Sequence, residues 1–293
     1  MTRLFSHLLL TVLSIVILTV PSFADLKEIQ EHGVIRHLGV PYARFVTGSG
    51  DGFSTDLLKG FAEEIGVRYQ YVETNWETVI SDLIGKDYTV TGGVATINSE
   101  KPSRGDVIAN GLTILPWRKQ LLLYSTPTFP SGVWLIAKAD ASIRPIHPSG
   151  DIQKDIAAVK SLLQNVSVLS MKGTCLDARL YNLGKTGARI VPVDLKMNEF
   201  APAVINGSAE TSLLDVADAL IALEKWPGQL KVIGPVSLPQ KMAAGFKKTD
   251  TELINRFNMY LIKIQQNGRY MELIEHYYPD IGIYFPGFFA QYK

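Results

Sequence analysis

The sequence contains very little cysteine, no excess of either charge and no obvious membrane span. Cys175 is the sole cysteine among the 293 residues, so an internal disulfide is excluded. The 29 basic and 28 acidic residues nearly cancel, which leaves no basic footprint for a nucleic-acid partner. The five histidines show no metal-ligand spacing, and we therefore expect no metal site and no cofactor.

The first 24 residues have the pattern of a secretory signal peptide. Arg3 precedes an apolar run of about 13 residues, Leu8–Val20, and Ser22-Phe23-Ala24 is a small-x-small cleavage site. The run is shorter than the roughly 20 residues that span a bilayer, so an uncleaved anchor is the weaker alternative. We expect a periplasmic chain that starts near Asp25, with 28 basic and 28 acidic residues.

Strand-like and helix-like segments alternate along the rest of the chain, which predicts two α/β domains. Ser54 or Thr55, Asn75 and Thr249 or Asp250 are the expected N-caps of three of the helices. The expected strands are 34–40, 67–72, 105–109, 133–137, 166–170, 189–193 and 232–236, and the expected helices are 25–32, 54–66, 76–84, 155–164, 176–183, 198–205, 216–223 and 249–265.

One stretch, residues 110–127, carries a distinctive set of polar residues. Gly111 and Thr113 lie beside an apolar segment, Arg118 follows five residues after the threonine, and Ser125 and Pro127 close the run. An arginine guanidinium is a planar fork that binds a carboxylate through two parallel hydrogen bonds. A threonine hydroxyl can add another bond, and a glycine lets a ligand approach the backbone.

This stretch resembles the periplasmic amino-acid-binding proteins of bacterial ABC importers, solute-binding family 3. That family has Gly-x-Thr-x-Thr-x-Glu-Arg, then six residues, then Ser-x-Pro-Tyr. Gly111, Thr113 and Arg118 fall in register with the pattern, whereas Pro116-Trp117 replaces the residues before the arginine and Thr128 replaces the final tyrosine. The resemblance extends over nearly the whole mature chain.

The resemblance implies a type II periplasmic binding protein fold: two α/β lobes in a Venus-flytrap arrangement, with two crossover strands at the hinge. We expect lobe 1 to comprise residues 25–128 and 242–293, and lobe 2 to comprise residues 133–237. The hinge is expected near 129–132 and 238–241, where Pro/Gly turns adjoin apolar strands.

The resemblance also implies a site for a zwitterion between the lobes. Arg118 and Thr113, with Asn110 and Gly111 beside them, are expected to meet the ligand carboxylate. Asp215 corresponds to the family's ammonium-binding aspartate, although it is equally an N-cap for the helix that follows. The remaining candidates are a pair of rings expected to sandwich the ligand side chain, Tyr42 and Trp76, and a turn whose amides are expected to help hold the carboxylate, Thr174 and Cys175.

Residues 87–104 depart from the family, whose members pass almost directly from a Gly-Lys pair to the next strand. The segment is β-patterned, and we predict an inserted hairpin. It is compatible with a decoration, a lid or a partner surface.

The implied function is non-enzymatic capture of an amino acid, with a neutral or apolar side chain, for an ABC permease, by a monomeric protein. Two alternatives stay open. A sensory protein on the same scaffold is one of them. The other is an enzyme similar to cyclohexadienyl dehydratases, which is weakened because Val133 stands at their lysine position and Asp218 at their glutamate position.

Overall fold

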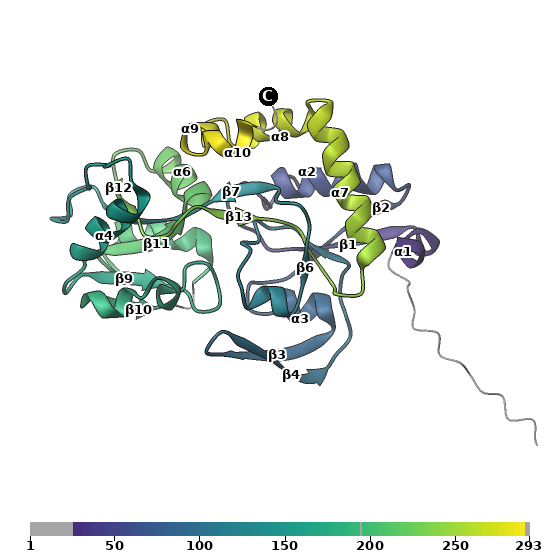
Figure 1. The fold of residues 1–293 in the computed structure, drawn as a ribbon, viewed down its shortest axis with the longest axis horizontal. Helices are drawn as coiled ribbons and strands as arrows, with labels where there is room; N and C mark the ends of the chain where they lie inside the picture. Colours follow the sequence, from purple (N-terminus) through teal and green to yellow (C-terminus); the bar gives the residue numbers. More distant parts are fainter. Residues whose placement is uncertain (1–25, 194, 291–293) are drawn as a thin grey trace, which may run out of the picture.

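The computed structural model describes residues 26–193 and 195–290, so the expected signal segment lies outside the described residues. Two five-stranded sheets lie at opposite ends of the molecule, and two short strands run between them (Figure 1). This is the two-lobed α/β fold expected from the sequence. Within the part of the chain that the structure describes, no helix is long and apolar enough to cross a membrane.

The first sheet has the strand order β2-β1-β5-β14-β6, in which β1 is parallel to β2 and β5. Strand residues point alternately to opposite faces, so Ile35 joins the apolar cluster that contains α2 and Leu38 joins the one that contains α3. The elements of this part are α1 Leu26–His32, β1 Val34–Gly39, α2 Phe53–Glu64, β2 Arg68–Glu73, α3 Val79–Ile84, β5 Val107–Ile108, the 3-10 helix η1 Arg118–Gln120, β6 Leu123–Tyr124, β14 Gly245–Phe246 and α7 Thr251–Gln266.

The predicted insertion is an antiparallel hairpin of β3 Lys86–Thr91 and β4 Val94–Glu100. Gly92 and Gly93 join the strands with φ angles of +60° and +82°, which only glycine adopts without strain. The hairpin lies beyond α3, at the bottom of Figure 1. It therefore forms a separate layer on the first lobe instead of extending the central sheet.

The second sheet has the order β10-β9-β11-β8-β12. β9 is parallel to β10 and β11, whereas β8 is antiparallel to β11 and β12. Its core is apolar on both faces. The elements are β8 Val133–Lys138, α4 Ile152–Ser161, β9 Ser167–Ser170, the 3-10 helices η2 Ala178–Tyr181 and η3 Leu183–Thr186, β10 Arg189–Pro192, the 3-10 helix η4 Met197–Glu199, α5 Phe200–Ile205, β11 Thr211–Asp215, α6 Val216–Lys225 and β12 Leu230–Pro235.

Two strands connect the sheets, β7 Phe129–Ser131 and β13 Gln240–Met242. They pair with each other in antiparallel register, with Met242 opposite Phe129 and Gln240 opposite Ser131. They form a two-stranded ribbon of their own between the two larger sheets, at the centre of Figure 1.

The C-terminal segment reaches from the first sheet toward the second. It comprises α8 Arg269–Tyr277, α9 Ile281–Tyr284 and α10 Pro286–Phe289, which follow α7 along the top of Figure 1. The ring of Tyr284 contacts that of Trp134 on β8 edge to face, with centroids 5.2 Å apart. The end of the chain is thus in contact with the second sheet as well as with the first.

Several expected helix boundaries are wrong. α2 begins at Phe53, with Gly52 at the N-cap position and no side-chain cap from Ser54 or Thr55. α3 begins at Val79 instead of Trp76, although Asn75 caps the turn of residues 76–78 that leads directly into it, since its side chain accepts from the amides of residues 77 and 78. Residues 176–183 form 3-10 turns where an α-helix was expected.

Asp82 on α3 is buried, and its carboxylate contacts residues that follow strand β2 and residues that follow strand β4. Its carboxylate accepts hydrogen bonds from Thr74 and Thr78, and it forms ion pairs with Lys101 at 3.2 Å and Arg104 at 2.8 Å. Burial alone raises the pKa of Asp82, but these hydrogen bonds and charges outweigh burial and hold the pKa below its usual value.

We expect Asp82→Asn to lower the free energy of unfolding by about 1–3 kcal/mol at pH 7, because it breaks a buried charged network. A carboxylate with a lowered folded-state pKa stabilises the fold above its unfolded pKa of 3.8, so the deficit should shrink as pH falls below that value. Urea denaturation measured at pH 7 and pH 3 tests both points. Asp140→Asn, at an exposed carboxylate, is the control and should change stability by less than about 0.5 kcal/mol.

Candidate functional site

The candidate residues of the first lobe follow the carboxyl ends of its parallel strands. Tyr42 follows β1, Trp76 follows β2, and Gly111 and Thr113 follow β5. Ligands of open α/β sheets bind outside this end of the strands, where successive loops diverge. The topology therefore brings Tyr42 and Thr113 into one pocket, although they are 71 positions apart in the chain.

This pocket is small, with an empty volume of about 180 Å³, and it lies between the two sheets. Seven of the predicted site residues line it together with one that was not predicted, Met197. The lining residues are Tyr42, Trp76, Gly111, Thr113, Arg118, Cys175, Met197 and Asp215.

Of the described residues, Arg118 is the only cation that lines the pocket, and it is almost fully buried, with 2% of its surface exposed. Nη1 donates to the carbonyl of Thr113 at 3.1 Å, and Nη2 donates to that of Gly173 in the second lobe at 3.2 Å. Nε has no hydrogen-bond partner. No carboxylate among the described residues forms an ion pair with this guanidinium, so its charge lacks a counter-ion within the chain.

Thr113 and Gly111 leave space and a free hydroxyl next to Arg118. The Thr113 hydroxyl is buried without a hydrogen bond of ordinary geometry, although it lies beside the Cys175 thiol. Gly111 has a φ angle of +68°, and a Cβ there would come within 2.6 Å of the Phe45 ring. Glycine is therefore required by both backbone conformation and packing.

Asp215 supplies the acidic group of the pocket from the end of β11 and is fully buried. Its Oδ2 accepts from the Tyr42 hydroxyl, and its Oδ1 accepts from the amide of Asp218 at 3.2 Å, so it caps α6 and faces the pocket at once. Burial raises the pKa of Asp215 to about 7. Burial and the nearby charge of Asp215 raise the pKa of Asp218 as well. Among the described residues neither carboxyl forms an ion pair.

Tyr42 and Trp76 both line the pocket, but they do not face each other across it. Their rings meet edge to face, with centroids 5.7 Å apart and an interplanar angle of 84°. The Tyr42 ring also stacks on Phe45, while its hydroxyl is held by Asp215. The expected sandwich is therefore wrong in this arrangement, because the rings touch directly. The Trp76 indole N–H is buried without a hydrogen-bond partner.

The turn at 173–175 differs from the expected anion site. The Gly173 amide donates to the Asp177 carboxylate at 3.3 Å, and the Gly173 carbonyl accepts from Arg118. Thr174 uses its hydroxyl inside the turn, donating to Met171 and accepting from Leu176, and it does not line the pocket. No α-helix starts here whose dipole would attract an anion.

Asn110 also lies outside the pocket lining. It is fully buried and donates to the carbonyl of Leu38 at 3.0 Å, and its own oxygen lies 3.2 Å from His37 Nε2. Burial lowers the pKa of His37 to about 4, so this imidazole is neutral near pH 7. Asn110 thus ties β1 to the chain after β5, directly behind Gly111.

Met197 was missed because nothing in the sequence marks it. It lies on η4, next to Asn198, whose side chain accepts from the amide of Ala43 at 3.0 Å across the groove. A lone methionine in a polar stretch carries no spacing signal, and only the fold places it opposite the first lobe.

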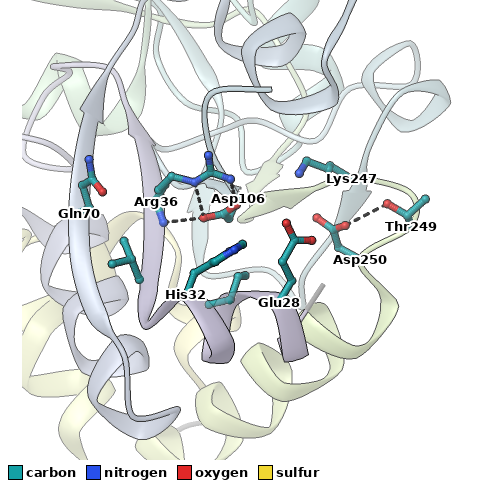
Figure 2. Close-up of a pocket in the computed structure, with 10 residues that line it drawn as sticks. Glu28, His32, Arg36, Gln70, Asp106, Lys247, Thr249 and Asp250 are labelled. Atoms are coloured by element: carbon teal, nitrogen blue, oxygen red, sulfur yellow. Dashed lines mark hydrogen bonds and ion pairs between the residues drawn. The ribbon is translucent and has the colours of Figure 1, made fainter. Parts of the chain in front are cut away.

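A larger pocket lies at the opposite ends of β1 and β2, with an empty volume of about 1150 Å³ against about 180 Å³ for the pocket between the sheets. Figure 2 shows its charged lining, in which Arg36 and Asp106 bond to each other and Lys247 and Asp250 lie on the other side. It is formed by the amino-terminal ends of the strands, and it contains none of the candidate residues. We therefore assign the functional site to the smaller pocket between the sheets.

Residues 94–280 match the bacterial extracellular solute-binding proteins, family 3. The chain belongs to this family. Over 231 residues it is 25% identical to the octopine-binding periplasmic protein of Rhizobium meliloti, covering 72% of this chain and 71% of the relative. It is 23% identical over 269 residues to the L-cystine-binding protein TcyJ of Escherichia coli K12, covering 89% and 90%.

Solved structures agree with this membership. A mutant of the arginine-binding protein ArgBP from T. maritima superposes with a TM-score of 0.68 at 25% identity, over 87% of this chain and 99% of that one. Some relatives are enzymes: the membrane-bound lytic murein transglycosylase F of Desulfosudis oleivorans is 22% identical, but the match spans only 44% of its length.

Cys175 is expected to be chemically inert in the folded protein. It is 4% exposed, and burial raises the pKa of its thiol, so little nucleophilic thiolate forms at neutral pH. Reaction with Ellman's reagent at pH 8 should release almost no thiolate from native protein and one equivalent per chain in 6 M guanidinium chloride. Rapid labelling of the native protein would contradict the buried placement of this residue.

Proposed function

We propose that the chain captures a small amino-acid-like zwitterion between its lobes and delivers it to an ABC importer in the inner membrane. One observation carries the proposal: a buried guanidinium and a buried carboxyl, Arg118 and Asp215, line one small pocket, and each lacks an ion-pair partner among the described residues. Burying unpaired charge is costly, and a bound zwitterion supplies both counter-charges at once.

In this proposal the ligand carboxylate binds at Arg118. The Nε atom of Arg118, the Thr113 hydroxyl and the Trp76 indole N–H are three buried groups without a hydrogen-bond partner, all at this pocket. Each can donate to a carboxylate oxygen, and bonds between charged partners are the strong ones. Asn110 supports this wall from behind, and Thr174 shapes the turn that receives Nη2 of Arg118.

The ligand ammonium binds at Asp215 in the same scheme. Its Oδ2 now accepts from Tyr42, and an ammonium group would take that place or share it. The ligand side chain would contact Met197, Cys175 and the two rings. Among the described residues Asp215 is the only acidic one that lines the pocket, which favours a neutral or apolar ligand side chain over one with a second positive charge.

The two ends of the ligand would then join different lobes. We assign residues 25–128 and 242–293 to lobe 1 and residues 133–237 to lobe 2, with the hinge near 129–132 and 238–241. The β7–β13 ribbon supports this division, although Tyr284 contacts the second sheet from the C-terminal segment. A ligand that contacts both lobes favours a closed form through those differential contacts.

A periplasmic, monomeric protein that delivers its ligand to a permease fits the family and the expected signal segment. We propose binding, not catalysis, as the activity. Val133, at the lysine position of the related dehydratases, is apolar and fully buried on β8. It offers no group for proton transfer at the place where those enzymes have an amine.

Arg118→Ala and Asp215→Ala should each weaken amino-acid binding by about 10- to 150-fold, because each removes one charge-assisted contact. A thermal-shift screen over the standard L-amino acids identifies the probe, and isothermal calorimetry with that amino acid measures the affinities. Lys119→Ala, at the exposed neighbour of Arg118, is the matched control and should bind normally. Unchanged affinity in both site variants would refute the assigned site.

Affinity should rise with pH between about 5 and 7 and then level off. The ammonium group binds the ionised form of Asp215, whose pKa burial raises to about 7 in the ligand-free pocket. Below that pH the carboxyl must lose a proton before it binds, which costs up to tenfold in affinity per pH unit. Calorimetry from pH 5 to 8 tests this. The slope should vanish in Asp215→Asn, and an equally steep slope there would assign the titration to another group.

A further inference from the structure

The inserted hairpin is bonded to the same short helix that carries Arg118. Gln120, two residues further along η1, donates from Nε2 to the Gly93 carbonyl at 2.8 Å and accepts from the Ala95 amide at 3.0 Å. One side-chain amide therefore satisfies two backbone groups at the tip of the hairpin. This attachment fixes the position of η1 relative to β4, within the same lobe.

A chain of ring contacts runs from the hairpin to the guanidinium. The Tyr88 ring of β3 lies on the Trp117 ring, with centroids 5.9 Å apart and an interplanar angle of 33°. The Arg118 guanidinium lies 5.3 Å from the centroid of the Trp117 ring and 5.9 Å from that of Trp76. Trp117 is only 8% exposed, so Tyr88 covers a ring that would otherwise face solvent.

These contacts matter because no carboxylate in the described part of the chain forms an ion pair that would orient Arg118. Two carbonyls accept from its terminal nitrogens, and the rings of Trp76 and Trp117 lie next to the guanidinium. A planar fork binds a carboxylate in two parallel bonds only when that plane is fixed in the correct direction. Interactions of a cation with a ring face are strongest at buried sites such as this one.

We propose that the β3–β4 hairpin is a positioning element for Arg118, with Tyr88 and Gln120 as positioning residues for carboxylate capture. The inference rests on the proposed function, because it assigns the insertion a role at that same site. Neither residue lines the pocket. Tyr88 acts through the Trp117 ring, and Gln120 acts through the backbone of η1.

The first test needs no ligand. Rotation about the Nε–Cζ bond of Arg118 interchanges its two Nη groups, and NMR measures its rate from the exchange between the two ¹⁵Nη signals. The ¹⁵Nε–¹Hε signal of Arg118 is assigned by its loss in Arg118→Lys. We expect faster rotation in Tyr88→Ala and in Gln120→Ala. Tyr88→Phe keeps the ring and should behave like the unaltered protein, as should Thr89→Ala at the exposed neighbouring position. Rotation rates that do not differ between Tyr88→Ala and Thr89→Ala would overturn the proposal.

The second test is a double-mutant cycle in the binding assay, with the L-amino acid that gave the largest thermal shift as probe. Tyr88→Ala and Gln120→Ala should each weaken binding by about 3- to 10-fold, mainly through faster dissociation, because an immobilised side chain becomes mobile. In the Arg118→Lys background the same changes should have no further effect. An equal loss in both backgrounds would show that the hairpin acts elsewhere and would overturn the proposal.

The two proposals fail in different ways. If Arg118→Ala and Asp215→Ala bind the probe normally, the proposed function is refuted, whatever the NMR rates show. If those variants lose affinity but the hairpin variants neither bind more weakly nor free the guanidinium, only the positioning role is refuted. Thermal melting of each variant verifies the fold, and Gln120→Ala, at an exposed side chain, keeps the test decisive if Tyr88→Ala does not fold.

Discussion

The structure buries one full positive charge and one carboxyl at the same small pocket, and neither forms an ion pair within the described residues. Arg118 is 2% exposed and Asp215 is not exposed at all, and each spends its hydrogen bonds on uncharged groups. An isolated buried charge is among the most costly features of a fold, and proteins keep such features where they serve a function. The free-energy cost of burial is lowered in a different way for each of the two groups. Arg118 lies over aromatic rings, whereas the pKa of Asp215 rises toward neutrality because of burial.

The rest of the molecule can be understood as the support for these two groups. The loops after the parallel strands β1, β2 and β5 meet at one edge of the first sheet, and Asp215 lies at the end of β11 in the second sheet. Gly111 leaves room for the Phe45 ring, and the Phe45 ring stacks on Tyr42. Each contact is ordinary by itself. Together they exclude water from the place where the opposite charges of a ligand would be held.

The sequence predicted those parts of this site that depend on local pattern. Alternating apolar segments predicted the strands. The spacing of Gly111, Thr113 and Arg118 predicted that they belong to one site, and all three line the same pocket. The prediction failed in two places, one where local polar groups competed with the helix and one where a distant residue intervenes. Where a helix was expected after residue 175, the chain forms 3-10 turns. The Thr174 hydroxyl makes its hydrogen bonds with the backbone of the turn just before them. Tyr42 and Trp76 were expected to face each other, but Asp215, 173 positions away from Tyr42, turns its ring aside.

The ribbon of β7 and β13 has a mechanical consequence for the groove. It consists of only two strands, and Pro130, opposite Lys241, has no amide proton to donate to its neighbour. A narrow ribbon with few rungs twists at small cost, since no third strand resists it. Side-chain contacts away from this ribbon also join the two halves of the molecule, such as Arg44 with Glu224 at 2.6 Å and Tyr42 with Asp215. A change in the angle between the sheets would have to break these outer contacts, whereas the ribbon itself would only have to twist.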